Sequence, residues 1–243
     1  MPDPLSWMIL VGTAFVGSIV GGVAGFGAAV ILLPVTAWTL GIRMAVPVLT
    51  ITMLLGNISR LWWSRGETDR QVVGRFLLGA IPATALGTTF FVAASSDALS
   101  RVIGGFLLAS VPLRRVLSMG HWRVRLAHFP FIGVFFGLLS STVVAIGAAL
   151  TPFYLAYGLR RGAYIATEAV CAFSMHVTRG AVLSRHKLLT WEVVTIGVVL
   201  GVVMFAGSWI GRRLLDRMSD RVFLAVIESL LLIMGLQFLF FPR

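Results

Sequence analysis

Five ionisable side chains stand inside long apolar stretches of this sequence, where a charge is costly to bury: Arg60, Glu168, His176, Arg179 and Glu228. Ionisable residues inside membrane-spanning segments are rare and are usually functional. Because a guanidinium matches the geometry of compact oxyanions, Arg60 and Arg179 are candidates to attract or gate an anion. Snorkelling toward lipid headgroups is the alternative, since each arginine lies near the end of an apolar stretch.

Three of these residues share one stretch of the chain. Glu168 precedes Arg179 by eleven residues, or about three helical turns, and His176 precedes Arg179 by three. A carboxylate or an imidazole can take up a proton, so Glu168 and His176 are candidates for proton coupling. A structural hydrogen bond or salt bridge is the alternative for both. Asn57, one turn before Arg60, could donate to the same anion or bond a neighbouring helix.

The composition indicates a polytopic membrane protein. Of the 243 residues, 58% are apolar and 12% are charged, where a soluble domain has about 25% charged residues. The net charge of +11 is clustered between apolar runs, a pattern that sets membrane topology, and we expect no nucleic-acid partner. Cys171 is the single cysteine, which excludes a disulfide framework and a cysteine-based metal site. We predict no metal, no cofactor and no catalytic residue.

Two of the apolar segments are too short to cross a membrane, which requires roughly 20 helical residues. They are residues 28–40 and 148–157, and each follows a longer segment across a break rich in small residues, GGVAGFG (21–27) and SSTVVAIG (140–147). The other apolar segments are residues 5–23, 44–63, 72–93, 99–112, 129–146, 162–183, 188–210 and 222–241.

The chain also repeats itself, because residues 15–113 align with residues 131–236. Gly17 falls on Gly133, Pro34 falls on Pro152, and NISR (57–60) falls on HVTR (176–179). The collinear order predicts a duplication in which each half has a broken hairpin and three spans. The predicted units are a first repeat 1–113 (hairpin 5–41, spans 44–63, 72–93, 99–112), a basic cytoplasmic linker 114–128, and a second repeat 129–243 (hairpin 129–158, spans 162–183, 188–210, 222–241).

The distribution of basic residues selects a topology. If each short segment folds back as a re-entrant hairpin, each half crosses the membrane three times and the second half is inverted relative to the first. This arrangement places 13 Lys and Arg residues inside and 5 outside, whereas eight crossings would give 10 inside and 8 outside. The positive-inside rule favours the hairpins. The predicted fold is therefore an all-α polytopic membrane protein with two inverted repeats.

Inverted repeats with broken helices are typical of secondary transporters, whose substrate site lies where the breaks meet. Interrupted backbone in a membrane must face protein or a watery cavity, and the first positions of each half-helix offer free N–H groups to an anion. Close packing of helices is the alternative for the glycines. The predicted substrate-binding residues are Gly25, Gly27, Ala28, Asn57, Arg60, Ser140, Ser141, Thr142, Gly147, Ala148, His176 and Arg179.

The glycine-rich break GGVAGFGAAVILLP, the collinear second copy and the chain length together resemble the sulfite exporter TauE/SafE family of membrane permeases. The resemblance covers nearly the whole chain, although the second copy has SSTVVAIG in place of the glycine run. It implies transport of small anions, often sulfur-containing, such as sulfite or a sulfonate like sulfoacetate. It also implies location in the bacterial inner membrane.

We therefore predict a secondary transporter of a small sulfur-containing anion that works by alternating access in the lipid bilayer. The alternatives are another small anion such as a carboxylate, or a membrane scaffold that transports nothing. An intramembrane hydrolase would need Ser140 or Ser141 with His176 and Glu168, but no nucleophile-elbow motif is present. The sequence leaves the coupling ion open and is compatible with a homodimer.

Overall fold

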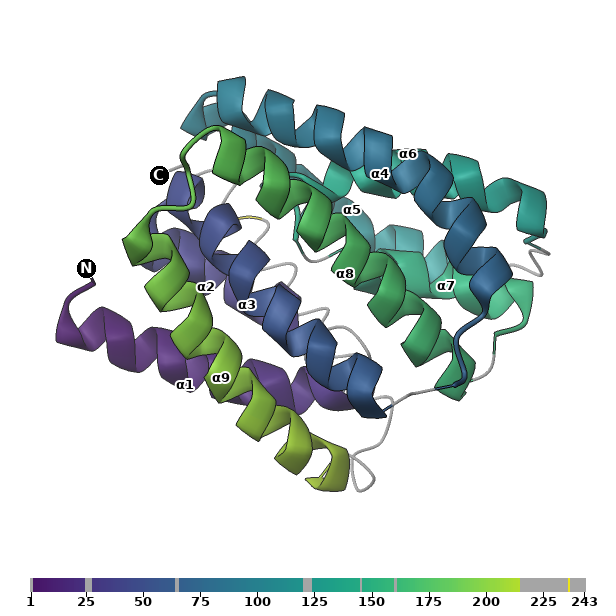
Figure 1. Cartoon of the computed structure of the whole chain (residues 1–243), viewed down its shortest axis with the longest axis horizontal. Coiled ribbons are helices and arrows are strands. Elements are labelled where there is room, and N and C mark those ends of the chain that lie inside the picture. The colour runs from purple at the N-terminus through teal and green to yellow at the C-terminus, as the bar shows by residue number, and fades with distance from the viewer. Residues whose placement is uncertain are drawn as a thin grey trace.

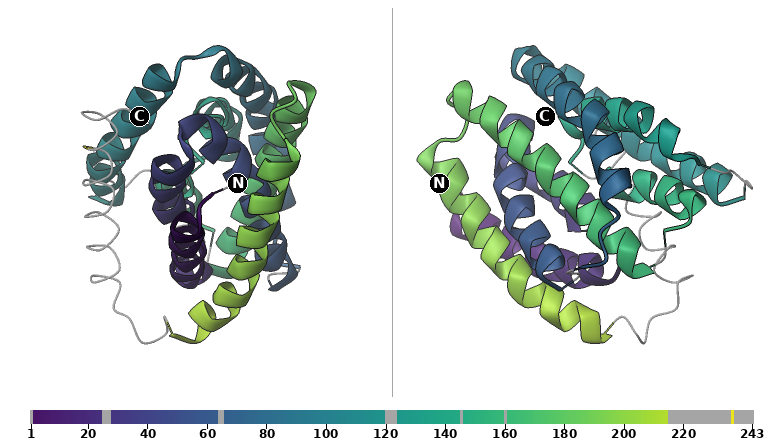
Figure 2. Two further views of the ribbon diagram at one scale, coloured as in Figure 1. Left: turned by 90° about the vertical axis from the view of Figure 1, so that its left-hand side faces the viewer. Right: turned by 45° about the vertical axis from the view of Figure 1, so that its right-hand side comes forward.

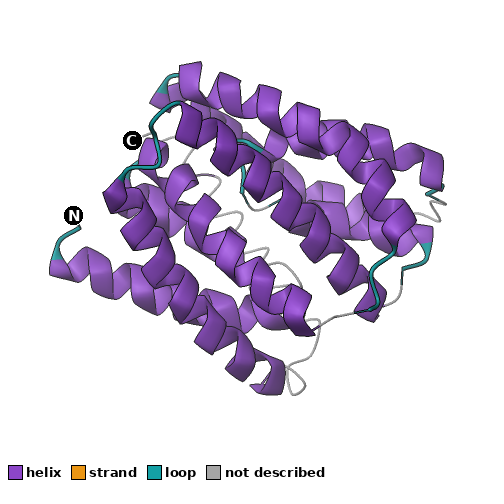
Figure 3. Ribbon diagram, in the orientation of Figure 1, coloured by secondary structure: helices purple, strands orange, loops and turns teal. Residues whose placement is uncertain are grey.

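The fold of the chain is helical throughout its described residues. The structure is a computed structural model that describes residues 2–24, 28–63, 66–119, 124–144, 146–159, 161–214 and 236. These residues form α-helices and one short 3₁₀-helix and contain no strand (Figures 1 and 3), which confirms the all-α class. The elements are α1 (Pro4–Ala24), α2 (Ala28–Leu40), α3 (Ile42–Trp63), α4 (Arg70–Ala93), α5 (Ser96–Met119), η1 (Leu126–His128), α6 (Phe129–Ser140), α7 (Gly147–Tyr157), α8 (Arg161–Arg185) and α9 (Trp191–Leu214).

Three helices in the described part of the chain are long and apolar enough to cross a membrane: Pro4–Gly21 in α1, Arg70–Ala93 in α4 and Trp191–Ile210 in α9. Large apolar side chains on the outer helices are exposed, including Phe90 on α4 and Phe131 on α6. Such exposure suits contact with lipid. The helices α3 and α8 are 22 and 25 residues long, but their polar residues reduce their apolar character.

Nine of the ten apolar segments coincide with helices, and the tenth, 222–241, lies outside the described residues apart from Leu236. Two boundaries differ from the expectation by more than four residues. The helix α6 ends at Ser140, six residues before the end of the predicted segment 129–146. The helix α5 continues past residue 112 to Met119 and so includes the first part of the predicted linker 114–128. Apolar patterning ends at residue 112, but the basic residues that follow are good helix formers, so the helix need not end with the apolar run.

The two central helices, α3 and α8, lie side by side, and each is flanked by two others. The helix α3 packs against α9, which in turn packs against α1, while α8 packs against α4, which packs against α6 (Figures 1 and 2). On α9, Gly197 faces Ile51 and Gly201 faces Leu55 of α3, so α3 and α9 run in the same direction. Gly207 of α9 faces Ser18 near the end of α1, which makes α1 parallel to both.

The helices α4, α6 and α8 run opposite to α1, α3 and α9. Along α4, Gly79 faces Pro130 near the start of α6, whereas Gly87 faces Leu138 near its end, so α4 and α6 are parallel. The helices α3 and α8 are antiparallel, because Arg179 late in α8 bonds Thr50 early in α3. The predicted repeats make α3 equivalent to α8 and α4 equivalent to α9. The two helices of each pair therefore run in opposite directions.

The helix breaks differ in how their two arms pack. In the first half, α2 folds back onto α1, and a Cβ atom on Gly21 would lie 3.0 Å from the backbone nitrogen of Ala28. Glycine permits this close return of the chain. In the second half, α6 packs mainly against α4, and α7 contacts α5 and α8. The helix α7 ends at Gly158, whose φ of 107° is the left-handed conformation that glycine adopts readily.

The contact between α4 and α6 predicts an effect of a single methyl group. A Cβ on Gly79 would clash with the carbonyl oxygen of Pro130, whereas a Cβ on Gly74 in the same helix meets nothing within 4 Å. We expect Gly79→Ala to destabilise the protein by about 1–3 kcal/mol, because two backbones must separate. Gly74→Ala is the matched control and should not lower the melting temperature. Thermal unfolding in detergent measures both, and equal melting temperatures would contradict this packing.

Candidate functional site

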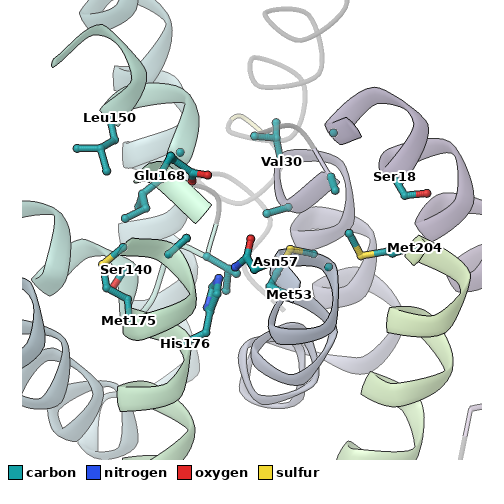
Figure 4. Close-up of a pocket in the computed structure, with 18 of the residues that line it drawn as sticks. Ser18, Val30, Met53, Asn57, Ser140, Leu150, Glu168, Met175, His176 and Met204 are labelled. Atoms are coloured by element: carbon teal, nitrogen blue, oxygen red, sulfur yellow. The ribbon is translucent and has the colours of Figure 1, made fainter. Parts of the chain in front are cut away.

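A cavity lies where the two helix breaks approach the middle of α3 and α8. Its volume is about 60 Å³. One water molecule needs roughly 10–15 Å³ of such space, so the cavity can hold several waters or one small ion. Most of its wall is apolar, and Figure 4 shows the side chains that line it. The polar side chains on the wall are those of Ser18, Asn57, Ser140, Glu168, His176 and Ser208.

Both helix breaks contribute to the wall. Gly21 and Ala28 come from the first break, and Ser140 and Gly147 come from the second. No side chain caps the start of α7, whose N-cap residue is Ile146. The first N–H groups of a helix have no partner within the helix and carry the positive end of its dipole. The cavity therefore borders a helix start that favours negative charge.

One face of α8 forms a long wall of the cavity. Glu168, Ala172, Met175 and His176 all line it, and their spacing of four, three and one residues places them on one side of the helix. On the opposite wall, Asn57 of α3 is 1% exposed, and its side chain and that of His176 point toward one another (Figure 4). Asn57 and His176 are residues that the repeat alignment pairs.

Arg179 lies directly behind this wall and is fully buried. Its Nε donates to Thr50 Oγ1 of α3 at 2.8 Å, and a second guanidinium nitrogen donates to the carbonyl oxygen of Ser140 at the end of α6. A third nitrogen hydrogen-bonds to Nδ1 of His176. One guanidinium thus connects three helices, and it contacts residues of the cavity wall without forming part of that wall.

The predicted site residues other than Arg179 fall into three groups, together with Glu168. Ser141 and Thr142 are buried beside the wall but do not line it, and Ser141 Oγ donates to the carbonyl oxygen of Leu138 at 2.6 Å. Ala28, Asn57, Ser140, Gly147, Glu168 and His176 do line the cavity. Gly25 and Gly27, and the side chains of Arg60 and Ala148, lie outside the described residues.

The hydroxyls of the second break are not arranged as hydrolytic nucleophiles. Ser140 Oγ donates to the carbonyl oxygen of Gly137 at 2.8 Å and lies 3.2 Å from Thr84 Oγ1. A serine nucleophile instead hydrogen-bonds to its general base. Within the described part of the chain, no three His, Cys, Asp or Glu side chains lie close enough together to hold a metal ion.

Sequence reasoning missed three methionines and two serines of the cavity wall. Met53 lies one turn before Asn57, and Met175 is adjacent to His176, so helical periodicity from the polar residues could have found both. Met204, Ser18 and Ser208 come from the pairing of α1 with α9, for which the sequence has no local signal. Methionine is polarizable and flexible, which lets it fill irregular space in such a wall.

The apolar helices and their arrangement define an all-α membrane protein with a cavity between two helix breaks, whose mostly apolar wall carries a few polar side chains. The sequence model of the sulfite exporter TauE/SafE family matches residues 9–238, nearly the whole chain. The chain therefore belongs to the sulfite exporter TauE/SafE family, which confirms the resemblance and makes it a membrane transporter. Membership of a transporter family agrees with the prediction that it is not an enzyme. Searches of curated proteins and of solved structures find no match.

The position of Arg179 predicts a large loss of stability when its side chain is removed. Arg179→Ala would leave the buried Ser140 carbonyl and Thr50 hydroxyl without this donor, which we expect to cost about 2–5 kcal/mol. Arg185→Ala is the control, because Arg185 is an exposed residue of the same helix. Tryptophan fluorescence during thermal unfolding measures both. An Arg179→Ala protein as stable as the control would show that the guanidinium does not connect the helices.

Proposed function

We propose that the protein moves a small sulfur-containing anion, sulfite or a small sulfonate, across the membrane through this cavity. The observation that carries the proposal is a mostly apolar cavity with a few polar side chains, bordered by both helix breaks and by the central helices α3 and α8. Transporters with inverted repeats bind their substrate at such a place and move one half against the other to change access. Membership of the sulfite exporter TauE/SafE family supports the class of substrate.

The helix directions support two inverted repeats, 1–113 and 129–243. In each half the first arm and the central helix run opposite to their counterparts in the other half. Asn57 and His176 are paired by the repeat alignment and lie across the cavity from one another. Such a pairing is expected when a pseudo-two-fold axis in the membrane plane passes through the site.

The cavity offers a small anion several hydrogen-bond donors in a mostly apolar wall. The start of α7 supplies backbone N–H groups, the amide of Asn57 supplies side-chain donors, and His176 can supply one more. Low polarity elsewhere strengthens these interactions with a charged ligand. The hydroxyl of Ser140 already donates to Gly137, so it can offer the ligand only lone pairs.

The charge distribution supports location in the bacterial inner membrane with the linker 114–128 in the cytoplasm. The hairpin topology places 13 basic residues on the linker side and 5 on the other. Basic residues in short loops concentrate on the cytoplasmic side. The substrate and the bilayer are the partners that this function requires, and a homodimer stays a prediction.

Uptake into proteoliposomes tests the proposal directly. A panel of sulfite, methanesulfonate, sulfoacetate, sulfate and acetate separates sulfur anions from carboxylates. Ala172 lines the cavity, and the larger side chain in Ala172→Leu would place three more carbon atoms in that space. We expect this variant to reduce uptake at least tenfold, because the cavity is then filled. Ala181→Leu is the control, because Ala181 is exposed on the same helix and should retain wild-type uptake within about twofold.

Three results would contradict the proposal. Undiminished uptake by a folded Ala172→Leu protein would place the transport route elsewhere. Transport of acetate in preference to every sulfur anion would assign a carboxylate as the cargo. Absence of saturable uptake of any anion would support the scaffold alternative.

A further inference from the structure

We infer that the anion binds together with a proton on Glu168, while His176 stays neutral and donates a hydrogen bond into the cavity because Arg179 holds it in that state. The inference rests on the proposed function, since it concerns how the same cavity binds its anion. It assigns different roles to the two ionisable residues on the cavity wall of α8.

The protonation of His176 follows from its hydrogen bond with Arg179. A guanidinium has only N–H donors and stays protonated in proteins, so Nδ1 of His176 must accept the bond through its lone pair. The proton of the neutral ring is then on Nε2. Adding a second proton at Nδ1 would break this bond and place two positive charges side by side in a buried site.

Arg179 cannot easily move away to allow that protonation. It is fully buried, and its other nitrogens bond Thr50 and the carbonyl oxygen of Ser140. Ser140 is the last residue of α6, where the unsatisfied carbonyls of a helix favour a positive charge. Arg179 is therefore a positioning residue, because it acts on the anion through the tautomer of His176.

Glu168 lies two helical turns before His176 on the same wall and is 4% exposed. Figure 4 shows its carboxyl group directed into the cavity. Along α8 the two residues are about 12 Å apart, a gap in which a small oxyanion fits between their side chains. An ionised carboxylate would repel that anion strongly in a site of low polarity.

Protonation of Glu168 removes this repulsion and supplies a further donor. One proton from the aqueous phase forms an O–H bond with a carboxylate oxygen, and no bond of the anion is made or broken. The neutral carboxyl group can then donate that hydrogen to the anion. The anion and the proton therefore enter the cavity as a pair, with one unit of negative charge balanced by one proton.

The other titratable groups around Glu168 do not replace it in this role. Tyr154 of α7 and Cys171 of α8 lie close to Glu168, and both side-chain types are ordinarily neutral at pH 7. Asp69, the N-cap of α4, donates its backbone N–H to Thr167 Oγ1, and its carboxylate caps α4. The remaining titratable residues on the helices that pack against α8 and at its start are Arg43 and Arg60 on α3, Arg70 and Arg75 on α4, Tyr157 on α7, and Tyr164 and Arg161 on α8.

The test measures anion affinity as a function of pH in the full-length protein. Methanesulfonate is the probe, because it does not titrate between pH 5 and pH 8. Tryptophan fluorescence or calorimetry of detergent-purified protein gives the dissociation constant. We expect wild-type affinity to fall as pH rises, by up to tenfold per pH unit, since binding requires a proton.

Two variants on the same helix separate the roles. Glu168→Gln keeps a neutral donor at this position, so it should bind at every pH with the affinity that the wild type has in acid. His176→Gln retains an amide donor and should bind several-fold more weakly with an unchanged pH slope. Because both variants replace a cavity-lining residue with glutamine, a general effect of altered packing would not divide them in this way.

The state of His176 is tested separately by nitrogen NMR with labelled histidine. The chain has four histidines, and His176→Gln identifies the relevant signal. We expect the neutral Nε2–H tautomer from pH 5 to pH 8 in the wild type. In Arg179→Gln, provided that it folds, the ring should become protonated within this range and anion affinity should gain a second pH-dependent step.

The outcomes distinguish this inference from the proposed function on which it rests. If no anion binds at any pH, the proposed function fails. If methanesulfonate binds with no pH dependence in the wild type, the role of Glu168 is wrong. A pH slope that disappears in His176→Gln and persists in Glu168→Gln, or a wild-type His176 ring that titrates, would assign the proton to His176 and overturn the inference.

Discussion

A charge buried in the interior of a membrane protein needs hydrogen-bond partners, and Arg179 shows how this chain meets that constraint. Its guanidinium donates to α3, to the end of α6 and to His176 on its own helix. The carbonyl at the end of α6 needs a donor because the helix stops inside the protein. The same side chain thus bonds the end of α6 at the helix break and a residue of the cavity wall beside it.

Close packing of the outer helices complements this central arrangement. Glycines on α4, α6 and α9 allow backbones to approach one another, as at Gly133, where a Cβ would clash with the carbonyl oxygen of Phe76. Small residues at such interfaces are the usual basis of helix association in membranes. The flanking pairs pack tightly, whereas a cavity lies between the breaks and the two central helices, where several polar residues gather.

The two predicted repeats differ in the chemistry that they bring to the cavity. The alignment pairs Asn57 with His176, and both side chains face the cavity, yet among the described residues the ionisable carboxyl group on the wall, that of Glu168, comes from the second half. In the binding mode that we infer, this difference gives the proton and the anion separate contact points within one cavity. A transporter built from two identical halves would lack this division.

Much of the architecture could be predicted from local sequence. Apolar segment lengths located the helices, the small residues at 21–27 and 140–147 marked the breaks, and the rarity of charge in apolar runs singled out Glu168, His176 and Arg179. The end of α5 was misjudged, because apolar patterning stops before the helix does. Tertiary structure alone decided that Arg179 lies behind the wall and that Ser18, Met204 and Ser208 lie on it. These positions depend on which helices become neighbours, and contacts between distant segments leave no periodic signal in a single chain.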